Sequence, residues 1–414
     1  MNKSSNKFRH LVWPLVSLAL LLLFNAIFTD NFFKIEIKKQ DSAQAVQAPS
    51  GTVESPQPGT SWITPENYET VNGSAEAAAQ TVQDSAGQQA APEKKDGKGV
   101  SIFGYYLYGT PIDILNQGSK VMVLAIGMTL VIATGGIDIS VGAVMAIAGA
   151  IAALLISMLD AGTCIGAGMG PSVYWIIPVL AALVLATLAG FWNGMLVAGF
   201  GIQPMVATLV LMVAGRGVAQ LITDGQIITF DNPGLVFLCN GHALFLPFSV
   251  WIVVAMYVIF GLLTRKTAFG LFIESVGNNE RASRYAGIEA RRIKWLTYVI
   301  CGFCAGVAGL LAASNIKCAD SNNAGLYLEL DAILATVIGG TSMAGGRFFL
   351  SGSLVGAILI QTLTTTMYMK NVSPAIVQVP KAMVVIIVCL LQSPVFRAKV
   401  LSIFASKAAK GGVQ

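Results

Sequence analysis

The sequence predicts an all-α integral membrane protein of about ten transmembrane helices, one or more of which are broken. Hydrophobic residues make up 55% of the 414 residues and charged residues only 11%, whereas a soluble domain carries roughly 25% charged residues. The apolar residues also fall in long runs, most of them near the roughly 20 residues that a helix needs to span a bilayer. Lipid must therefore be the solvent for much of the chain.

Residues 1–29 are expected to form a cytoplasmic tail and a first transmembrane helix. Lys3, Lys7 and Arg9 precede an apolar run over residues 11–28. A secretory signal also begins with a basic segment and an apolar stretch. Here the run ends in NAIFTDNFF, which offers no small-x-small cleavage site, so we interpret it as an uncleaved membrane helix.

Residues 30–109 differ from the rest of the chain in composition. They are rich in Ala, Gln, Ser, Pro and Gly, as in AQAVQAPSGTVESPQPG. Such a segment cannot bury enough apolar surface to offset the entropy of ordering. We therefore expect a low-complexity, disordered extracytoplasmic insert, either a tolerated insertion or a loop that docks a partner.

Residues 110–396 are expected to form the transmembrane core. Nine further membrane segments are predicted at 119–134, 137–158, 173–200, 204–222, 244–264, 294–313, 331–340, 348–369 and 381–392. The segment at 331–340 is too short to cross a bilayer alone. It is expected to be a broken or half-spanning helix, or one that begins further upstream.

The positive charges predict the orientation of the chain. They gather in the N-terminal tail, in a central loop over 265–294 and in the C-terminal tail over 397–414. The positive-inside rule places all three in the cytoplasm. An even number of spans puts both termini there, and six spans before the central loop put that loop there too. The net charge of +5 thus reflects orientation, and we expect no nucleic-acid partner.

Paired glycines interrupt two of the apolar runs, at Gly135-Gly136 and at Gly339-Gly340. A helix break in a membrane leaves backbone groups that need a protein-lined or hydrated site, and such breaks mark binding or gating regions in transporters. The surrounding stretches, TLVIATGGIDISVGAVMAIAGAI and ATVIGGTSMAGGRFFLSGSLVGAIL, resemble each other. They indicate either two halves of common design or chance similarity between helices rich in small residues.

Asp138 follows the first glycine pair. An acid within an apolar run is a candidate functional group of a gate. The other interpretation is an N-cap, in which Asp138 begins a helix and accepts backbone N–H bonds.

Other polar side chains lie in or beside the spans: Asn193, Gln203, Arg216, Gln220 and Gln361. They either form hydrogen bonds between helices or line a hydrated path for a polar solute. Four of the five are neutral, which suits an uncharged solute.

The central loop, TRKTAFGLFIESVGNNERASRYAGIEARRIKW, keeps a helical spacing of apolar and small residues. A positive-inside anchor would need only the cations. The helical spacing of apolar and small residues, with breaks at Gly277 and Gly287, goes beyond what an anchor needs. It is typical of a short cytoplasmic helix that receives force from a soluble motor. We expect its contact face to contain Ile273, Val276, Ala282, Tyr285, Ala286 and Ile288. The phosphate-binding pattern G-x-x-x-x-G-K-[ST] does not occur in the sequence, so any ATP is expected to be used by another subunit, and no cofactor is expected on this chain.

The cysteines and histidines predict no metal site. There are only two histidines in the chain. Cys301 and Cys304 form a C-x-x-C within an apolar helix and are expected to pack in the core. Cys164, Cys239 and Cys318 fall in loops expected to face outward, where one disulfide could form.

Four motifs resemble the permease subunits of bacterial ABC sugar importers of the ribose, xylose, galactose and galactofuranose type. The motifs are MTLVIATGGIDISVGAVMAIAG, WNGMLVAGFGIQPMVATLVLMVAGRGVAQLIT, ESVGNNERASRYAGI and NNAGLYLELDAILATVIGGTSMAGGR. The resemblance covers about residues 108–392, and the second and fourth motifs are most similar to the galactofuranose type.

The resemblance implies a multi-pass protein of the bacterial inner membrane that works with partner proteins. These would be cytoplasmic ABC ATPase subunits that use ATP, a periplasmic sugar-binding protein and a second permease copy, with a homodimer expected. It also implies that the ATPase docks on 274–288, so the expected coupling residues are Glu274, Gly277, Asn278, Arg281, Ala282, Ala286 and Gly287. Members of the family have a short outer loop where this chain has its insert, which leaves the footprint of the binding protein on that side open.

The predicted function is therefore the pore of an ATP-driven sugar importer that works by alternating access, not an enzyme. An ion-coupled secondary sugar transporter is the alternative. It should carry buried acids for ion coupling, and only Asp138 is a candidate. A channel would show filter-like rings, and a membrane enzyme would need a catalytic constellation inside the spans; neither pattern is found in the sequence.

Overall fold

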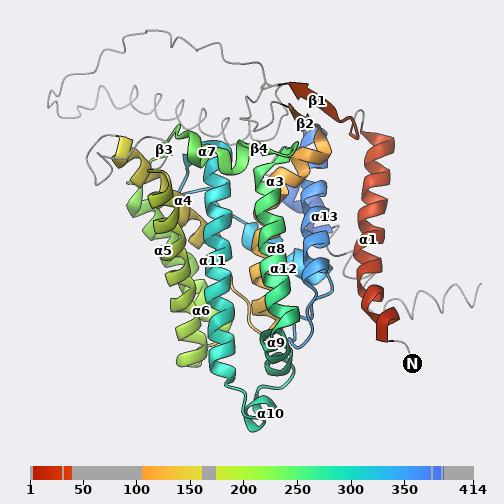
Figure 1. The fold of residues 1–414 in the computed structure, drawn as a ribbon, viewed down its shortest axis with the longest axis vertical. Helices are drawn as coiled ribbons and strands as arrows, with labels where there is room; N and C mark the ends of the chain where they lie inside the picture. The colour runs from red at the N-terminus through yellow and green to blue at the C-terminus, as the bar shows by residue number, and fades with distance from the viewer. Residues whose placement is uncertain are drawn as a thin grey trace, which may run out of the picture.

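The computed structural model describes residues 3–29, 32–39, 105–160, 174–373, 376–383 and 386. Most of the predicted insert, the C-terminal tail over 397–414 and most of the predicted span 381–392 lie outside these residues. The described part is an upright bundle of helices, with three short strand pairs at one end and the small helices α9 (Ala268–Asn278) and α10 (Glu280–Tyr285) at the other (Figure 1).

The predicted all-α membrane fold is confirmed. Within the described residues, seven helices are long and apolar enough to cross a bilayer. They are α3 (Thr110–Ala133), α4 (Val141–Asp160), α5 (Ile176–Gly194) with its π-helical continuation η3 (Met195–Gly199), α6 (Pro204–Ile222), α8 (Phe248–Lys266), α11 (Ala290–Ile316) and α13 (Leu350–Met369). Helix α1 (Lys3–Phe28) and the 11-residue helix α12 (Leu328–Ile338) overlap two of the other predicted segments, and the helical residues 376–383 overlap only the start of the predicted segment 381–392.

Several predicted boundaries are wrong, for local reasons. Helix α3 begins at Thr110 and not at 119, because Pro111 suits the first turn of a helix and Ile112 and Ile114 are buried despite polar neighbours. Helix α4 begins at Val141 and not at 137, because residues 134–140 form a turn. Helix α12 begins three residues before the segment 331–340, which agrees with the predicted alternative of a helix that begins further upstream. The short helix α7 (Pro233–Asn240) was not predicted.

Both ends of the predicted insert are ordered, which corrects the expectation of disorder for those residues. Strand β1 (Glu36–Lys39) pairs antiparallel with β2 (Tyr105–Tyr108), with Ile37 opposite Leu107. The chain therefore leaves and re-enters the bundle at one place. Two further pairs lie at the same end, β3 (Ile228–Thr229) with β6 (Cys318–Ala319) and β4 (His242–Ala243) with β5 (Leu246–Pro247) (Figure 1).

Helix α11 stands at the centre of the bundle and packs against α3, α4 and α5. Its glycines allow this close approach. A Cβ added to Gly302 would lie 2.6 Å from the carbonyl oxygen of Ala186 and 2.7 Å from the Cα of Gly190, both on α5. A Cβ added to Gly306 would lie 2.6 Å from the Cβ of Ala186. The backbones of α5 and α11 thus touch without intervening side chains.

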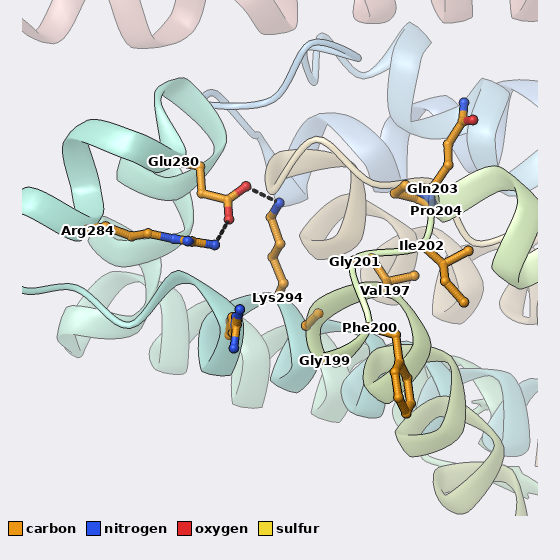
Figure 2. Close-up of a pocket in the computed structure, with 12 residues that line it drawn as sticks. Val197, Gly199, Phe200, Gly201, Ile202, Gln203, Pro204, Glu280, Arg284 and Lys294 are labelled. Carbon is orange, nitrogen blue, oxygen red and sulfur yellow. Dashed lines mark hydrogen bonds and ion pairs between the residues drawn. The ribbon is translucent and has the colours of Figure 1, made fainter.

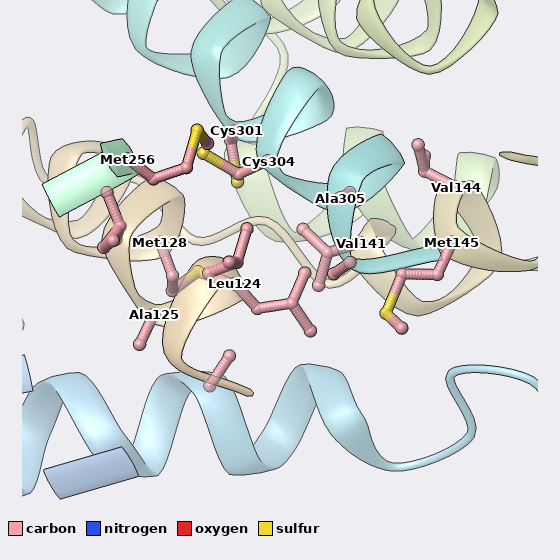
Figure 3. Close-up of a cluster of buried hydrophobic side chains, with 14 of the residues drawn as sticks. Leu124, Ala125, Met128, Val141, Val144, Met145, Met256, Cys301, Cys304 and Ala305 are labelled. Atoms are coloured by element: carbon pink, nitrogen blue, oxygen red, sulfur yellow. The ribbon is translucent and has the colours of Figure 1, made fainter. Parts of the chain in front are cut away.

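Where α3, α4 and α11 meet, a cluster of apolar side chains fills the core (Figure 3). Cys301 and Cys304 lie in this cluster, are fully buried and are free thiols, so their predicted packing role is confirmed. Cys239 and Cys318 are free as well, and Cys164 lies outside the described residues. A disulfide between Cys239 and Cys318 is therefore not formed.

Helices α5, α6 and α8 form the periphery. Their apolar side chains are largely exposed, as at Leu180, Val184 and Leu188 on α5 and at Val210 and Val213 on α6. In water such a surface would be unfavourable, whereas in a bilayer it is the surface that lipid covers.

The close contact between α5 and α11 predicts that a larger side chain at Gly302 strongly destabilises the protein. The substitution Gly302→Leu should lower the stability of the protein in detergent by about 3 kcal/mol, because the nearest atoms are backbone that cannot yield. Gly217→Leu on α6 is the matched control, since nothing lies within 4 Å of a Cβ added there. Thermal unfolding curves of the two variants should differ clearly; similar midpoints would show that the helices can separate at no cost.

Candidate functional site

The first glycine pair ends helix α3. Gly135 has φ +80°, a conformation that favours glycine. Its N–H donates to the carbonyl of Ile132 at 2.9 Å, and the N–H of Gly136 donates to the carbonyl of Val131 at 3.1 Å. This pair of bonds is the Schellman motif that terminates helices.

The second glycine pair ends helix α12 in the same way. Gly340 has φ +88° and its N–H donates to the carbonyl of Val337 at 2.9 Å. The N–H of Thr341 donates to the carbonyl of Thr336 at 3.1 Å. The two similar stretches thus share a backbone geometry as well as a sequence pattern. Gly339 also lets the end of α12 pack closely on α13, because a Cβ there would lie 2.6 Å from the carbonyl oxygen of Gly352.

Helix α9 lies directly against the end of α3 and the loop that follows α12. The N–H of Gly346, in the loop after α12, donates to the carbonyl of Ala133 at 2.9 Å. A Cβ added to Gly277 of α9 would collide with that carbonyl and would lie 2.5 Å from the Gly346 nitrogen. Gly345 lies beside the Gly277 carbonyl and the Gly135 nitrogen. We call Ala133, Gly135, Gly277, Gly345 and Gly346 the glycine junction; it joins a predicted coupling residue to a predicted gate residue.

Asp138 is 1% exposed and organises the chain between α3 and α4. Its Oδ1 accepts from the backbone N–H and the hydroxyl of Ser140, at 3.0 and 2.6 Å, and from Asn193 Nδ2 at 3.4 Å. Asn193 Nδ2 also donates to Ser140 Oγ at 2.8 Å. Asp138 and Asn193 were predicted separately, and the structure brings them together.

The prediction that Asp138 is itself the N-cap is wrong by two residues. The carbonyl of Ser140 accepts the first helical bond, from the N–H of Val144 at 3.0 Å. Asp138 therefore supports the turn that leads into α4, through a side-chain bond to a backbone N–H two residues on. Ser140 was missed because a serine in a small-residue run gives no distinct signal. Gly136 lies in this region too, against the hydroxyl of Tyr298.

Arg216 holds the turn segment that precedes α12. Its Nη1 donates to the backbone carbonyls of Ser321 and Ala324, at 3.2 and 2.5 Å. One turn further along α6, Gln220 Nε2 donates to Asn322 Oδ1 at 2.7 Å. These contacts favour the hydrogen-bonding interpretation of Arg216. Gln203 lies just before α6 and its side chain makes no capping bond.

Two buried acids on α12 were missed. Asp331 accepts from Lys381 Nζ at 3.1 and 2.9 Å, and both residues are 6% exposed. The two residues are 50 positions apart, so their pairing gave no local signal. Glu329 is 4% exposed and lies against Gly142 in the first turn of α4, where a helix carries partial positive charge.

Side-chain caps define the small helices α9 and α10. Thr267 Oγ1 accepts from the N–H of Phe269 at 3.2 Å, and Asn279 Oδ1 accepts from the N–H of Ala282 at 3.0 Å. Gly287, with φ +84°, ends α10. The break at Gly287 thus matches the prediction, whereas Gly277 lies inside α9 and serves close packing.

Most of the predicted coupling residues lie on the surface. The exposed ones are Glu274, Asn278, Arg281, Ala282, Ala286 and Gly287. Tyr285 is 93% exposed. The predicted contact face is wrong at Ile273 and Val276, which are buried against the protein's own core. The amphipathic spacing there reflects internal packing.

A charged clamp, formed by Glu280, Arg284 and Lys294, ties α10 to α11 (Figure 2). Glu280 Oε1 pairs with Arg284 Nη2 and Oε2 with Lys294 Nζ, each at 2.6 Å. The hydrogen bond from Lys294, with help from Arg284, holds the pKa of Glu280 below its ordinary value of 4.5. Glu280 was missed because its charge was taken as part of a generally polar loop.

Comparison with known proteins agrees with this arrangement. A family model described as the permease component of the branched-chain amino acid transport system matches residues 110–390. The chain is 56% identical to the galactofuranose transporter permease of Escherichia coli K12 over 290 residues, which is 70% of this chain and 81% of that protein. It is 41% identical to a fructose import permease of Bifidobacterium longum, over 70% and 78% of the two chains.

A ribose import permease of Escherichia coli K12 is 34% identical, over 70% of this chain and 87% of that protein. No solved structure matches the chain. These relatives confirm the resemblance to sugar import permeases that the sequence motifs indicated. The chain therefore belongs to the family of transport-system permease components that the matching model describes.

Proposed function

We propose that this chain is the membrane-spanning permease subunit of an ATP-driven sugar importer of the inner membrane, with galactofuranose or a related monosaccharide as its cargo. The 56% identity to a galactofuranose transporter permease supports the sugar class, and the fructose and ribose import permeases support it more broadly. These relatives disfavour the ion-coupled alternative. The contact of Gly277 with the end of α3 and with the loop after α12 carries the mechanism.

The partners follow from this role. A cytoplasmic ATPase docks on the exposed surface of α9 and α10, and both chain termini lie on the same side of the membrane as that surface. A periplasmic sugar-binding protein docks at the opposite end, where the strand pairs lie, and a second copy of the permease completes the transporter. The excess of cations in 265–294 supports this orientation.

The glycine junction supplies a route for the coupling motion. ATP binding closes the motor subunits and displaces α9. Because Gly277 meets the Ala133 carbonyl and the Gly346 nitrogen without an intervening side chain, the displacement reaches the end of α3 and the loop after α12 together. Packed backbones shift between discrete arrangements and do not deform continuously, so the bundle opens to one side as it closes to the other.

Reconstitution tests the function. The permease in proteoliposomes, together with its ATPase and binding protein, should accumulate galactofuranose only when ATP is present. The permease alone should accumulate none. Uphill accumulation by the lone permease under a proton or sodium gradient would refute the importer proposal and restore the ion-coupled one.

A bulky side chain at the glycine junction should uncouple sugar transport from ATP use by the motor subunits. Gly277→Trp should reduce ATP-driven sugar uptake by at least about 100-fold while the protein still inserts into the membrane, because the new side chain separates α9 from the Ala133 carbonyl. Gly261→Trp on α8 is the control, since a Cβ there has nothing within 4 Å. Equal uptake by the two variants would remove Gly277 from the coupling route.

The clamp predicts an acid-sensitive contact. A carboxylate whose folded-state pKa is depressed adds stability above its unfolded pKa, and this stability is lost as the pH falls through the lower, folded value. The wild type should therefore lose stability below about pH 4.5 through release of α10 from α11. In Glu280→Gln the unfolding midpoint, measured between pH 7 and 3.5, should fall less at the acid end than it does in the wild type.

Glu289→Gln is the control, because it breaks only the exposed pair with Arg292; its unfolding midpoint should depend on pH as the wild type's does. If the midpoint of Glu280→Gln also depended on pH as the wild type's does, Glu280 would not be the source of the acid sensitivity.

A further inference from the structure

A cavity of about 270 Å³ lies between the charged clamp and the turn that joins η3 to α6. One wall carries the side chains of Glu280, Arg284, Arg291 and Lys294, and the other is the chain from Val197 to Pro204. Figure 2 shows the clamp on one side and Phe200 and Ile202 on the other. The cavity thus joins a charged wall to an apolar one.

The charged wall has an excess of positive charge. Glu280 is already satisfied by Arg284 and Lys294. Arg291 lines the same cavity and forms no ion pair within the described part of the chain. Arginine and lysine together form the usual protein site for a phosphate group. The N-terminal end of α6, which also lines the cavity, adds partial positive charge.

The opposite wall is open and apolar. Nothing lies within 4 Å of a Cβ added to Gly201, so the turn leaves space in front of it. Phe200 is 70% exposed, and Met205 and Val206 continue an exposed apolar surface along α6. A free phosphate ion would use only the charged wall. A molecule with a phosphate and acyl chains would use both.

We propose that this cavity binds the headgroup of an anionic phospholipid of the cytoplasmic leaflet, with its phosphate at Arg291 and Lys294 and its acyl chains on α6. Basic pockets between helices on the cytoplasmic side suit such headgroups. The bound lipid lies beside the Glu280–Lys294 pair and so steadies α10 against α11. This inference needs only the cytoplasmic placement of 265–294 and is independent of the transported sugar.

Two adjacent arginines provide a matched test. Arg291 lines the cavity, whereas Arg292 pairs with Glu289 and does not. The purified full chain in detergent is titrated with phosphatidylglycerol and, separately, with neutral phosphatidylcholine, and bound lipid is counted by native mass spectrometry. We expect Arg291→Gln to bind phosphatidylglycerol about five-fold more weakly than wild type, the loss of one cation near the lipid surface. Arg292→Gln should bind as wild type does, and phosphatidylcholine should bind all three weakly.

A second variant fills the cavity without removing a charge. The atom nearest to a Cβ added to Gly199 is Met195 Cγ at 3.7 Å, so Gly199→Leu fits the backbone and occupies the open space. It should weaken phosphatidylglycerol binding even if Arg291→Gln does not fold, as judged by size-exclusion chromatography.

Three results would overturn the proposal. The first is equal phosphatidylglycerol binding by the Arg291→Gln and Arg292→Gln variants. The second is displacement of phosphatidylglycerol by millimolar inorganic phosphate, which would make free phosphate the ligand. The third is loss of ATPase co-purification in Arg291→Gln with lipid binding unchanged, which would make an acidic group of the ATPase the occupant. Sugar accumulation by the reconstituted wild type tests the proposed function separately.

Discussion

Direct contact between glycine backbones is the constraint on which the rest of the structure depends. In a bilayer, helices gain little from burying apolar surface against each other, since lipid is equally apolar, so association relies on close packing. Gly302 against Gly190 and Ala186 joins α11 to α5, and Gly339 against Gly352 joins α12 to α13. The glycine junction uses the same contact at the end of the bundle. Packing and the proposed coupling therefore share one physical basis.

Buried and half-buried polar groups hold the places where the chain leaves its helices. The turn before α4 is tied by Asp138, Ser140 and Asn193, and the segment before α12 is tied by Arg216. Each would otherwise leave backbone groups unsatisfied in a medium without water. The breaks are thus ordered structures with defined partners.

The end that carries α9 and α10 combines rigid and labile contacts. Gly277 meets backbone that cannot yield, whereas the clamp at Glu280 is a partly exposed ion pair, which contributes modestly and is screened by salt. A motor that moved α10 would break the clamp at low cost and keep the junction intact. The basic cavity beside the clamp places a lipid where it can favour the closed clamp.

The sequence by itself determined the membrane class, most of the spans, both helix breaks and the exposed surface of α9 and α10. These features rest on local chemistry: apolar length, glycine at positive φ and the placement of cations. Tertiary structure decided which polar groups pair, as with Asp331 and Lys381 or Glu280 and Lys294, and which glycines touch, as with Gly277 and Gly346. It also decided that Ile273 and Val276 face inward. Such contacts depend on distances between segments far apart in the chain, and hydropathy and residue spacing carry no information about those distances.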